Sequence, residues 1–440
     1  MRKFLIILLL CWGLSHGLAM AQEKLTLEAC LKEALSENPN LEMLKARIKA
    51  AESMAQAAKQ ERWPTLAARY SYLHLRDQQK VVIMGQDFPL SSHENIEFDF
   101  LFNFPVFHGF SLRIKEKLRK LDVELASFEY ERAVSRLIFE VNKAYYDVLK
   151  AKRGVIEARK SLKRLESHLE TAKAYYAQGL IAKHQVLESE VAYAQAEHAL
   201  IVAQNILDLA KGKLNVLLNR PVNAAIDVED ILSEKPKLEA FETYLEKALS
   251  RRPEIKAVLL ATEKARQNVR LAKSAYYPWV DLKAIYQKKG IDLLASRNPY
   301  GDRENIFVGF EINWLIWDWG ARKSKVSAAR AKVLEEEASL RDLKNRISLE
   351  VRAAYLDVQA AQKKLKVAER ALRSAEENFR LNEARFKEGL ATTTDVLDAE
   401  AFLTSARVRR IEALADLKTA YARLLYAAGI NQGPLKAETP

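Results

Sequence analysis

Two aspartates near the C-terminus, Asp395 and Asp398, are the ionisable residues whose spacing most suggests a function. They lie in the segment GLATTTDVLDAE (389–400), where Gly-Leu predicts the end of one helix and the following residues predict the start of another. Three residues apart, the two carboxylates share one face of that second helix. In its first turn they would complement the helix dipole and cap free amide groups. In several copies around a common axis, they would form rings of negative charge that attract cations.

An earlier segment, GLIAKHQVLESE (179–190), aligns with this one without a gap. Both segments contain Gly-Leu followed by Val-Leu-acid-x-Glu, and they lie 210 residues apart. The positions of the two aspartates are occupied here by Gln185 and Glu188, so one of the two negative charges is absent. The repeated motif therefore indicates a shared architecture with an asymmetric charge.

Residues that could carry out catalysis are not grouped in this sequence. The seven histidines show no H-x-x-x-H or H-E-x-x-H spacing, and no glycine-rich phosphate loop follows a predicted strand. The two cysteines, Cys11 and Cys30, have no base at a fixed spacing. We therefore predict that the protein is not an enzyme, binds no metal and needs no cofactor.

The N-terminal residues 1–21 have the three regions of a secretory signal peptide. Two basic residues come first, the apolar run FLIILLL follows, and AMA (19–21) supplies the cleavage pattern. Cleavage there leaves Cys30 without a disulfide partner, and an exported protein without disulfides suits a bacterial envelope. Lipidation at Cys11 is the weaker interpretation, because a bulky leucine precedes it.

The charged residues are spread along the predicted helices. The formal charge of +12 falls to +10 when the two basic residues of the signal peptide are removed. Lysine and arginine alternate with glutamate, which is typical of solvated helix faces, so we expect no nucleic acid partner. After residue 21 no apolar run approaches the roughly 20 residues that a membrane-spanning helix requires. A membrane-spanning part would therefore have to consist of strands.

The remaining chain is a tandem repeat. Residues 34–39 (ALSENP) return as 248–253 (ALSRRP), an offset of 214 residues. From about residue 140 onward the offset is 210 and holds through both Gly-Leu segments. The predicted organisation is a signal peptide (1–21), repeat 1 (22–219), an inter-repeat linker (220–239), repeat 2 (240–429) and a C-terminal tail (430–440).

Both repeats have the same predicted order of elements. These are a helix (40–62 and 254–277), a β-hairpin (65–107 and 279–316), a long helix (111–178 and 321–388) and a return helix (184–218 and 394–428). At 1.5 Å per residue, a long helix of ~65 residues measures about 100 Å, so it must pack against other helices along its length. Its apolar residues follow 3-4 spacing, for example from Ala354 to Phe379, which predicts an antiparallel coiled coil.

The predicted strands alternate between apolar and polar side chains. In NIEFDFLFNF (95–104) apolar residues occupy one face and polar residues the other, as in strands of outer-membrane barrels. Five tryptophans lie at the strand–helix junctions, where an aromatic belt meets a membrane interface: Trp63, Trp279, Trp314, Trp317 and Trp319. A soluble sheet is the alternative, but no helix is left over to cover it. Four strands cannot close a barrel, so copies must combine, and the sequence alone leaves two or three copies open.

Together these features resemble the TolC-type outer-membrane efflux protein family, the outer-membrane factors of tripartite efflux and type I secretion systems. The resemblance covers essentially all of the mature chain and is most specific over residues 385–400. It implies a mainly α fold with membrane β structure: a homotrimer with a 12-stranded outer-membrane β-barrel, four strands per chain, and long antiparallel coiled-coil helices forming a periplasmic α-barrel. It also implies an exit duct in outer-membrane lipid that extends into the periplasm and works with a periplasmic adaptor protein and an inner-membrane transporter.

The resemblance also implies roles for individual residues. It places the pore constriction at Asp395 and Asp398, and the adaptor-contact tips at Gly179, Leu180, Ile181, Gly389, Leu390 and Ala391. In well-studied members a tyrosine, an arginine and an aspartate hold the entrance closed. The matching residues are Phe386, Ala391 and Gln185, which cannot form those links. We therefore expect other gate contacts, with Gln185, Glu188, Arg385 and Phe386 as the candidates.

The competing interpretation is a coiled-coil scaffold or stalk of the periplasm or outer membrane that does not transport. A scaffold needs no lipid-facing strands, so the alternating strands favour the duct.

Overall fold

A computed structural model describes residues 24–430 of the chain. The predicted signal peptide and residues 431–440 of the predicted tail lie outside the described residues. The chain divides into two compact units, and each takes segments from both repeats. Unit 1 comprises Glu131–Arg252 with the described parts of Met1–Glu42 and Asn345–Pro440, and unit 2 comprises Met43–Tyr130 and Pro253–Lys344.

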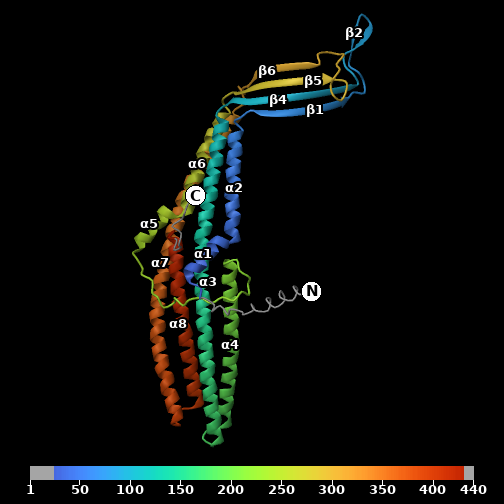
Figure 1. Cartoon of the computed structure of the whole chain (residues 1–440). Helices are drawn as coiled ribbons and strands as arrows, with labels where there is room; N and C mark the ends of the chain where they lie inside the picture. Colours follow the sequence, from blue (N-terminus) through green and yellow to red (C-terminus); the bar gives the residue numbers. More distant parts are fainter. Residues whose placement is uncertain (1–23, 431–440) are drawn as a thin grey trace, which may run out of the picture. The chain divides into compact units, whose positions relative to one another are not determined.

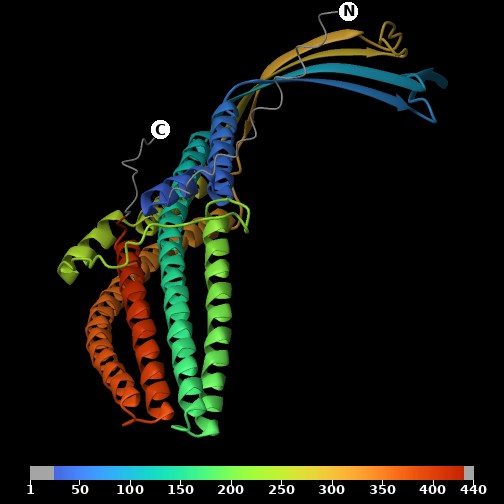
Figure 2. The same cartoon turned by 60° about the horizontal axis from the view of Figure 1, so that its bottom comes forward.

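Unit 1 is helical. It contains α1 (Leu27–Glu37), α4 (Lys183–Leu217), α5 (Phe241–Arg251), α8 (Thr393–Ala427) and the C-terminal parts of α3 (Ser111–Ala177) and α7 (Ala321–Lys387). Figures 1 and 2 show α7, α8, α3 and α4 side by side in that order. The two long helices have 67 residues each, and Gly154 of α3 is the sole glycine or proline in either of them. Their hydrogen-bond ladders are therefore uninterrupted.

The predicted apolar seam forms the core of unit 1. On α7 the seam residues Ile347, Val351, Ala354, Val358, Ala361, Leu365 and Ala368 are all buried. On α3, Val148 and Ala151 are buried as well. Closer to the turn that follows α7, the seam residues Leu372 and Phe379 are half-buried. The coiled-coil prediction is confirmed, and the packing is tightest away from the helix turns.

The shorter helices differ from the prediction at their ends. α2 (Pro39–Gln60) and α6 (Pro253–Ser274) begin at proline, which fits the first helical position because its missing N–H would be unpaired there. They end two and three residues before the predicted boundaries. α1 and α5 were not predicted as separate helices, because at 11 residues each their patterns are too short to stand out.

Unit 2 carries a four-stranded antiparallel sheet with the order β1-β4-β5-β6 (Figure 1). The strands are β1 (Thr65–His74), β4 (Glu94–His108), β5 (Trp279–Gly290) and β6 (Glu304–Asn313). The hairpins of the two repeats join through β4 and β5. A small hairpin that was not predicted, β2 (Lys80–Ile83) with β3 (Gln86–Pro89), lies in the segment between β1 and β4.

The sheet has one apolar and one polar face. On the apolar face Phe100 lies opposite Tyr286, and on the polar face Asp99 lies opposite both Arg69 and Gln287. The predicted alternation is therefore present across neighbouring strands as well as along each strand. Among residues 24–430, no helix is both long enough and apolar enough to span a membrane.

Candidate functional site

The two Gly-Leu segments form the same turn. Gly179 and Gly389 have φ of +74° and +72°, a conformation that glycine adopts without strain. The Gly179 and Leu180 amides donate to the carbonyls of Tyr176 and Tyr175, both at 2.9 Å. The Gly389 and Leu390 amides make the equivalent bonds to Phe386 and Arg385, at 3.0 and 2.8 Å. Both long helices therefore end in a Schellman motif, with their last carbonyl groups satisfied.

The leucine of each turn is exposed. Leu180 is 66% exposed and Leu390 is 68% exposed, while the following Ile181 and Ala391 are half-buried. A leucine that only closed over its own helix end would be covered. Each turn instead presents an apolar side chain on a hydrogen-bonded backbone.

Asp395 is part of the cap of α8. The Thr392 amide donates to Asp395 Oδ2 at 2.8 Å, and the Asp395 amide donates to Thr392 Oγ1 at 3.2 Å. This reciprocal pair is a capping box. The hydrogen bonds from the backbone and side chain of Thr392 lower the pKa of Asp395, so its carboxylate is held in the charged form. The capping interpretation of Asp395 is therefore correct.

Asp398 lies one turn further along α8 and is exposed. Its carboxylate makes no hydrogen bond or ion pair with any residue between 24 and 430. In repeat 1, Ala182 occupies the N-cap of α4 and its side chain forms no cap bond. Gln185 is half-buried, and Glu188 accepts a hydrogen bond from the Thr394 hydroxyl at 3.2 Å. The two repeats therefore differ in the capping of their return helices as well as in charge.

Phe386 packs within its own chain. It is 4% exposed, and its ring centroid lies 4.9 Å from that of His168 and 5.6 Å from that of Tyr175. The Tyr175 hydroxyl donates to the Lys387 carbonyl at 3.3 Å. Desolvation lowers the pKa of His168, with the charge of Glu383 acting in the opposite direction. This cluster of Phe386, His168 and Tyr175, the tip cluster, joins the ends of α3 and α7.

The basic gate candidate, Arg385, makes a local contact. It donates to the Leu390 carbonyl at 3.2 Å, and the nearby Lys387 pairs with Glu383 at 3.0 Å. Within one chain, therefore, the side chain of Arg385 supports the turn and that of Lys387 is engaged on its own helix.

Sequence reasoning missed a buried polar network around Glu400, the last residue of GLATTTDVLDAE. Arg164 of α3 donates two hydrogen bonds to its carboxylate, at 2.7 and 2.8 Å, and Ser161 and Thr404 each lie 2.8 Å from Oε1. The Glu400 side chain is 4% exposed. The repeated Val-Leu-acid-x-Glu pattern singled out Glu400, but nothing local to the motif points to α3.

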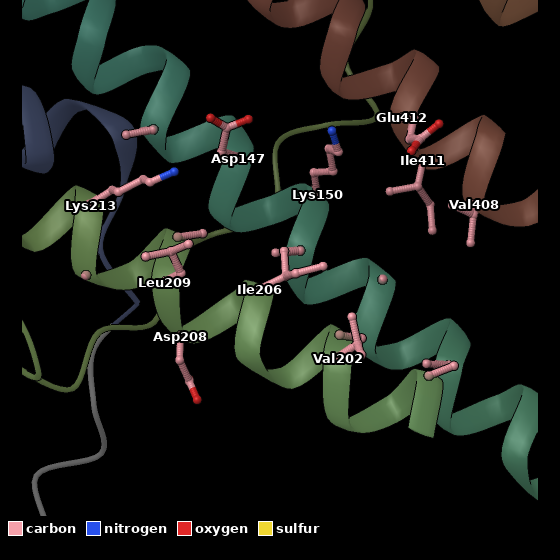
Figure 3. A pocket seen from close by; sticks show the side chains of 18 of the residues that line it. Asp147, Lys150, Val202, Ile206, Asp208, Leu209, Lys213, Val408, Ile411 and Glu412 are labelled. Carbon is pink, nitrogen blue, oxygen red and sulfur yellow. The ribbon is translucent and has the colours of Figure 1, made fainter. Parts of the chain in front are cut away.

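An open groove of about 1440 Å³ runs along α3 between α4 and α8 (Figure 3). Its sides are formed by Val202, Ile206 and Leu209 of α4 and by Val408 and Ile411 of α8. Charged side chains, among them Asp147, Lys150, Lys213 and Glu412, surround this apolar surface. No group of three histidine, cysteine, aspartate or glutamate side chains in residues 24–430 could hold a metal ion.

The five tryptophans lie at the ends of strands in unit 2. All are exposed: Trp63 by 67%, Trp279 by 48%, Trp314 by 58%, Trp317 by 70% and Trp319 by 91%. The segment carrying the last three is held by Arg322, which pairs with Asp318 and donates to the Leu315 and Ile316 carbonyls at 2.6 and 3.1 Å. The backbone there is fixed while its aromatic side chains face outward from the chain.

Comparisons with known proteins agree with this geometry. A family model for outer membrane efflux proteins matches residues 30–220 and 244–430. Outer membrane efflux protein BepC of Brucella suis biovar 1 is 30% identical over 164 residues, and protein CyaE of Bordetella pertussis is 30% identical over 186 residues. These matches cover 37% and 42% of this chain, and 34% and 39% of the length of the two relatives.

The fold is shared with solved structures. Outer membrane protein VceC from Vibrio cholerae superposes with a TM-score of 0.76, covering 92% of this chain and 96% of that chain at 22% identity. The family model matches both repeats over most of their length. The predicted resemblance is therefore confirmed: the chain belongs to the outer membrane efflux protein family and is a protein of the outer membrane.

Proposed function

We propose that three copies of this chain form an exit duct that passively conducts substrates from the periplasm to the exterior. The observation that carries the proposal is the four-stranded sheet, with one apolar face and no partner strand beyond β1 or β6 among the described residues. Backbone groups facing lipid must be paired, so such a sheet has to continue into further strands. Three copies supply twelve strands, enough to close a barrel around a water-filled lumen.

The tryptophans support the membrane placement. Indole rings favour the interface between hydrocarbon and water, and all five rings are exposed at strand ends. We assign Trp63, Trp279, Trp314, Trp317 and Trp319 to the contact with outer-membrane lipid at that interface.

The constriction is assigned to Asp395 and Asp398. Both are exposed at the start of α8, and three copies would bring six carboxylates to the entrance. Asp395 uses one oxygen in the cap, whereas both oxygens of Asp398 are free of contacts within the described chain. Asp398 should therefore contribute the larger share of any cation selectivity.

The turns are assigned to the periplasmic adaptor, which links the duct to an inner-membrane transporter. Leu180 and Leu390 are two-thirds exposed on hydrogen-bonded turns, and an apolar side chain held in this way suits an apolar pocket on a partner. Substituting Leu390 should abolish adaptor crosslinking while leaving the trimer intact. Loss of the trimer in that variant would instead assign the leucine a purely structural role.

Closure of the entrance is assigned to the tip cluster. Phe386 replaces the tyrosine of well-studied relatives and packs on His168 and Tyr175 in its own chain. In this assignment aromatic packing holds the tips of α3 and α7 together where other members use polar links.

Membrane extraction tests the duct against the scaffold. The duct predicts a protein released only by detergent, with a particle mass of three chains and heat-modifiable migration on gels. A protein that dissolves from the periplasm without detergent would support the scaffold.

A further inference from the structure

The two edge strands of the sheet, β1 and β6, have no second partner strand within residues 24–430. Among the described residues β1 pairs with β4 alone and β6 with β5 alone. Lipid offers no hydrogen bonds, so in the proposed trimer, on which this inference rests, β6 of one copy must pair with β1 of the next. The register of that pairing decides which residues form the interface.

The two hairpins are copies of each other in register as well as in sequence. An offset of 214 carries Thr65 onto Trp279, and an offset of 210 carries Asn103 onto Asn313. Thr65 lies opposite Asn103, and Trp279 lies opposite Asn313. The offsets that align the sequences therefore also align the strand pairs.

The joint between the hairpins supplies a template for the joint between copies. β4 meets β5 with Asn103 opposite Lys283. Adding 210 to Asn103 gives Asn313 of β6, and subtracting 214 from Lys283 gives Arg69 of β1. We infer that β6 pairs antiparallel with β1 of the neighbouring copy, with Asn313 opposite the neighbour's Arg69. The adjacent pairs, each β1 residue belonging to the neighbour, are Trp314–Ala68, Ile312–Tyr70, Glu311–Ser71 and Phe310–Tyr72.

This register matches the two faces of the sheet. Tyr70 lies opposite Phe98 on the apolar face of its own chain, and Ile312 lies opposite Val280. Joining Tyr70 to Ile312 continues the apolar face across the interface. A slip of one residue would turn the apolar side chains of one strand onto the polar face.

The register also lengthens β6. The equivalent of Trp314 is Phe104, which lies inside β4 opposite Leu282. In the single chain β6 ends at Asn313, and Trp314 follows it outside the strand. Opposite Trp314 the neighbour offers the small side chain of Ala68, which leaves room for the indole ring. Trp314 thus becomes a strand residue only when copies assemble.

A slip of two residues is the competing register. It keeps the faces matched and would place Arg69 opposite Glu311, a favourable pair of charges. Both registers keep the apolar and polar faces of the sheet continuous, so the faces do not distinguish them. The inferred register depends instead on the offsets of the tandem repeat.

Disulfide trapping separates the two registers. In a Cys30→Ala background, Ser71→Cys with Glu311→Cys tests the inferred register, and Ser71→Cys with Gly309→Cys tests the slipped alternative on the same face. Directly opposite residues have Cα atoms about 4.5–5.5 Å apart, whereas diagonal neighbours lie about 7–8 Å apart, beyond ordinary disulfide reach. Within one chain β4 and β5 lie between the two positions, which are therefore at least roughly 14 Å apart, so an intrachain disulfide cannot form.

Oxidised membranes are analysed on denaturing gels, and unoxidised particles by native mass spectrometry. The inferred register predicts covalent trimers from the Ser71–Glu311 pair, forming about tenfold faster than from the control pair. Faster linking of the control pair, or no linking of either pair in particles that are trimeric, overturns the register and leaves the duct standing. Particles that are not trimeric overturn the register and the proposed function together.

Discussion

Thr392 and Ala182 occupy the same position in the two repeats, but only Thr392 caps its helix. Thr392→Ala should destabilise the first turn of α8 by about 1 kcal/mol. Ala182→Thr is the matched variant, because Gln185 lies at the position that completes a capping box, and it should stabilise α4 by a similar amount. Hydrogen exchange of the amides in each first turn measures both effects. Equal exchange in the parent and both variants would contradict the assigned role of the cap.

The two aspartates should respond differently to substitution and to pH. Asp398→Asn should reduce the cation preference of the channel more than Asp395→Asn, because the Asp398 carboxylate has no hydrogen-bond or ion-pair partner in the described chain. The pKa of Asp395 is lowered, so its charge and its contribution to stability are fully present above its ordinary pKa of 3.8 and disappear as the pH falls through the lower value. The Asp398→Asn channel should therefore keep a residual cation preference at pH 4, measured from reversal potentials. Loss of that preference already at pH 5 would contradict the assignment.

At the scale of elements, the network around Glu400 joins α3 to α8. Glu400→Ala leaves Arg164 partly buried without its carboxylate, and breaking a buried pair in this way costs about 3–5 kcal/mol. The double variant Glu400→Leu with Arg164→Met removes both charges and should recover most of that loss. Thermal unfolding of the assembled protein measures the difference. A double variant that is no more stable than Glu400→Ala would show that the ion pair itself is not what holds the helices.

The tip cluster should loosen in acid. The pKa of His168 is lowered by desolvation, so the folded tip favours the neutral imidazole. Its contribution to stability is present above the ordinary pKa of 6.5 and is lost as the pH falls through the lower folded value. Channel conductance should rise between pH 7.5 and pH 5, with a smaller rise in His168→Phe, which keeps an aromatic ring against Phe386. An identical rise in both proteins would assign the response to groups other than His168.

Local sequence patterns predicted the helices and strands, but they did not predict contacts between residues that are distant in sequence. Gly389 and its counterpart indicated the turns because a left-handed residue at a helix end has a sequence signature. The alternating residues of β4 likewise identified both faces of the sheet. Arg164 is 236 residues from Glu400, and no periodicity reports such a pair. The packing of Phe386 against His168 depends on how two helix ends meet, which the pattern along either helix does not contain.

At the scale of the whole molecule, the tandem repeat organises both ends of the proposed duct. Two copies of one supersecondary unit produce two hairpins, which join into a single sheet in unit 2, and two pairs of long helices in unit 1. The same duplication supplies the register proposed between neighbouring chains. The repeats differ at the start of the return helices, where only repeat 2 has both the capping box and the pair of aspartates.

The central claim is that an assembly of this chain conducts ions through one acidic constriction. Purified detergent-extracted protein is inserted into a planar lipid bilayer, and single-channel currents are recorded across a gradient of potassium chloride. We expect discrete steps of uniform size, a reversal potential that shows preference for potassium over chloride, and larger steps with a weaker preference when Asp395 and Asp398 are both replaced by alanine. Absence of steps, or a selectivity unchanged by that double substitution, would contradict the account.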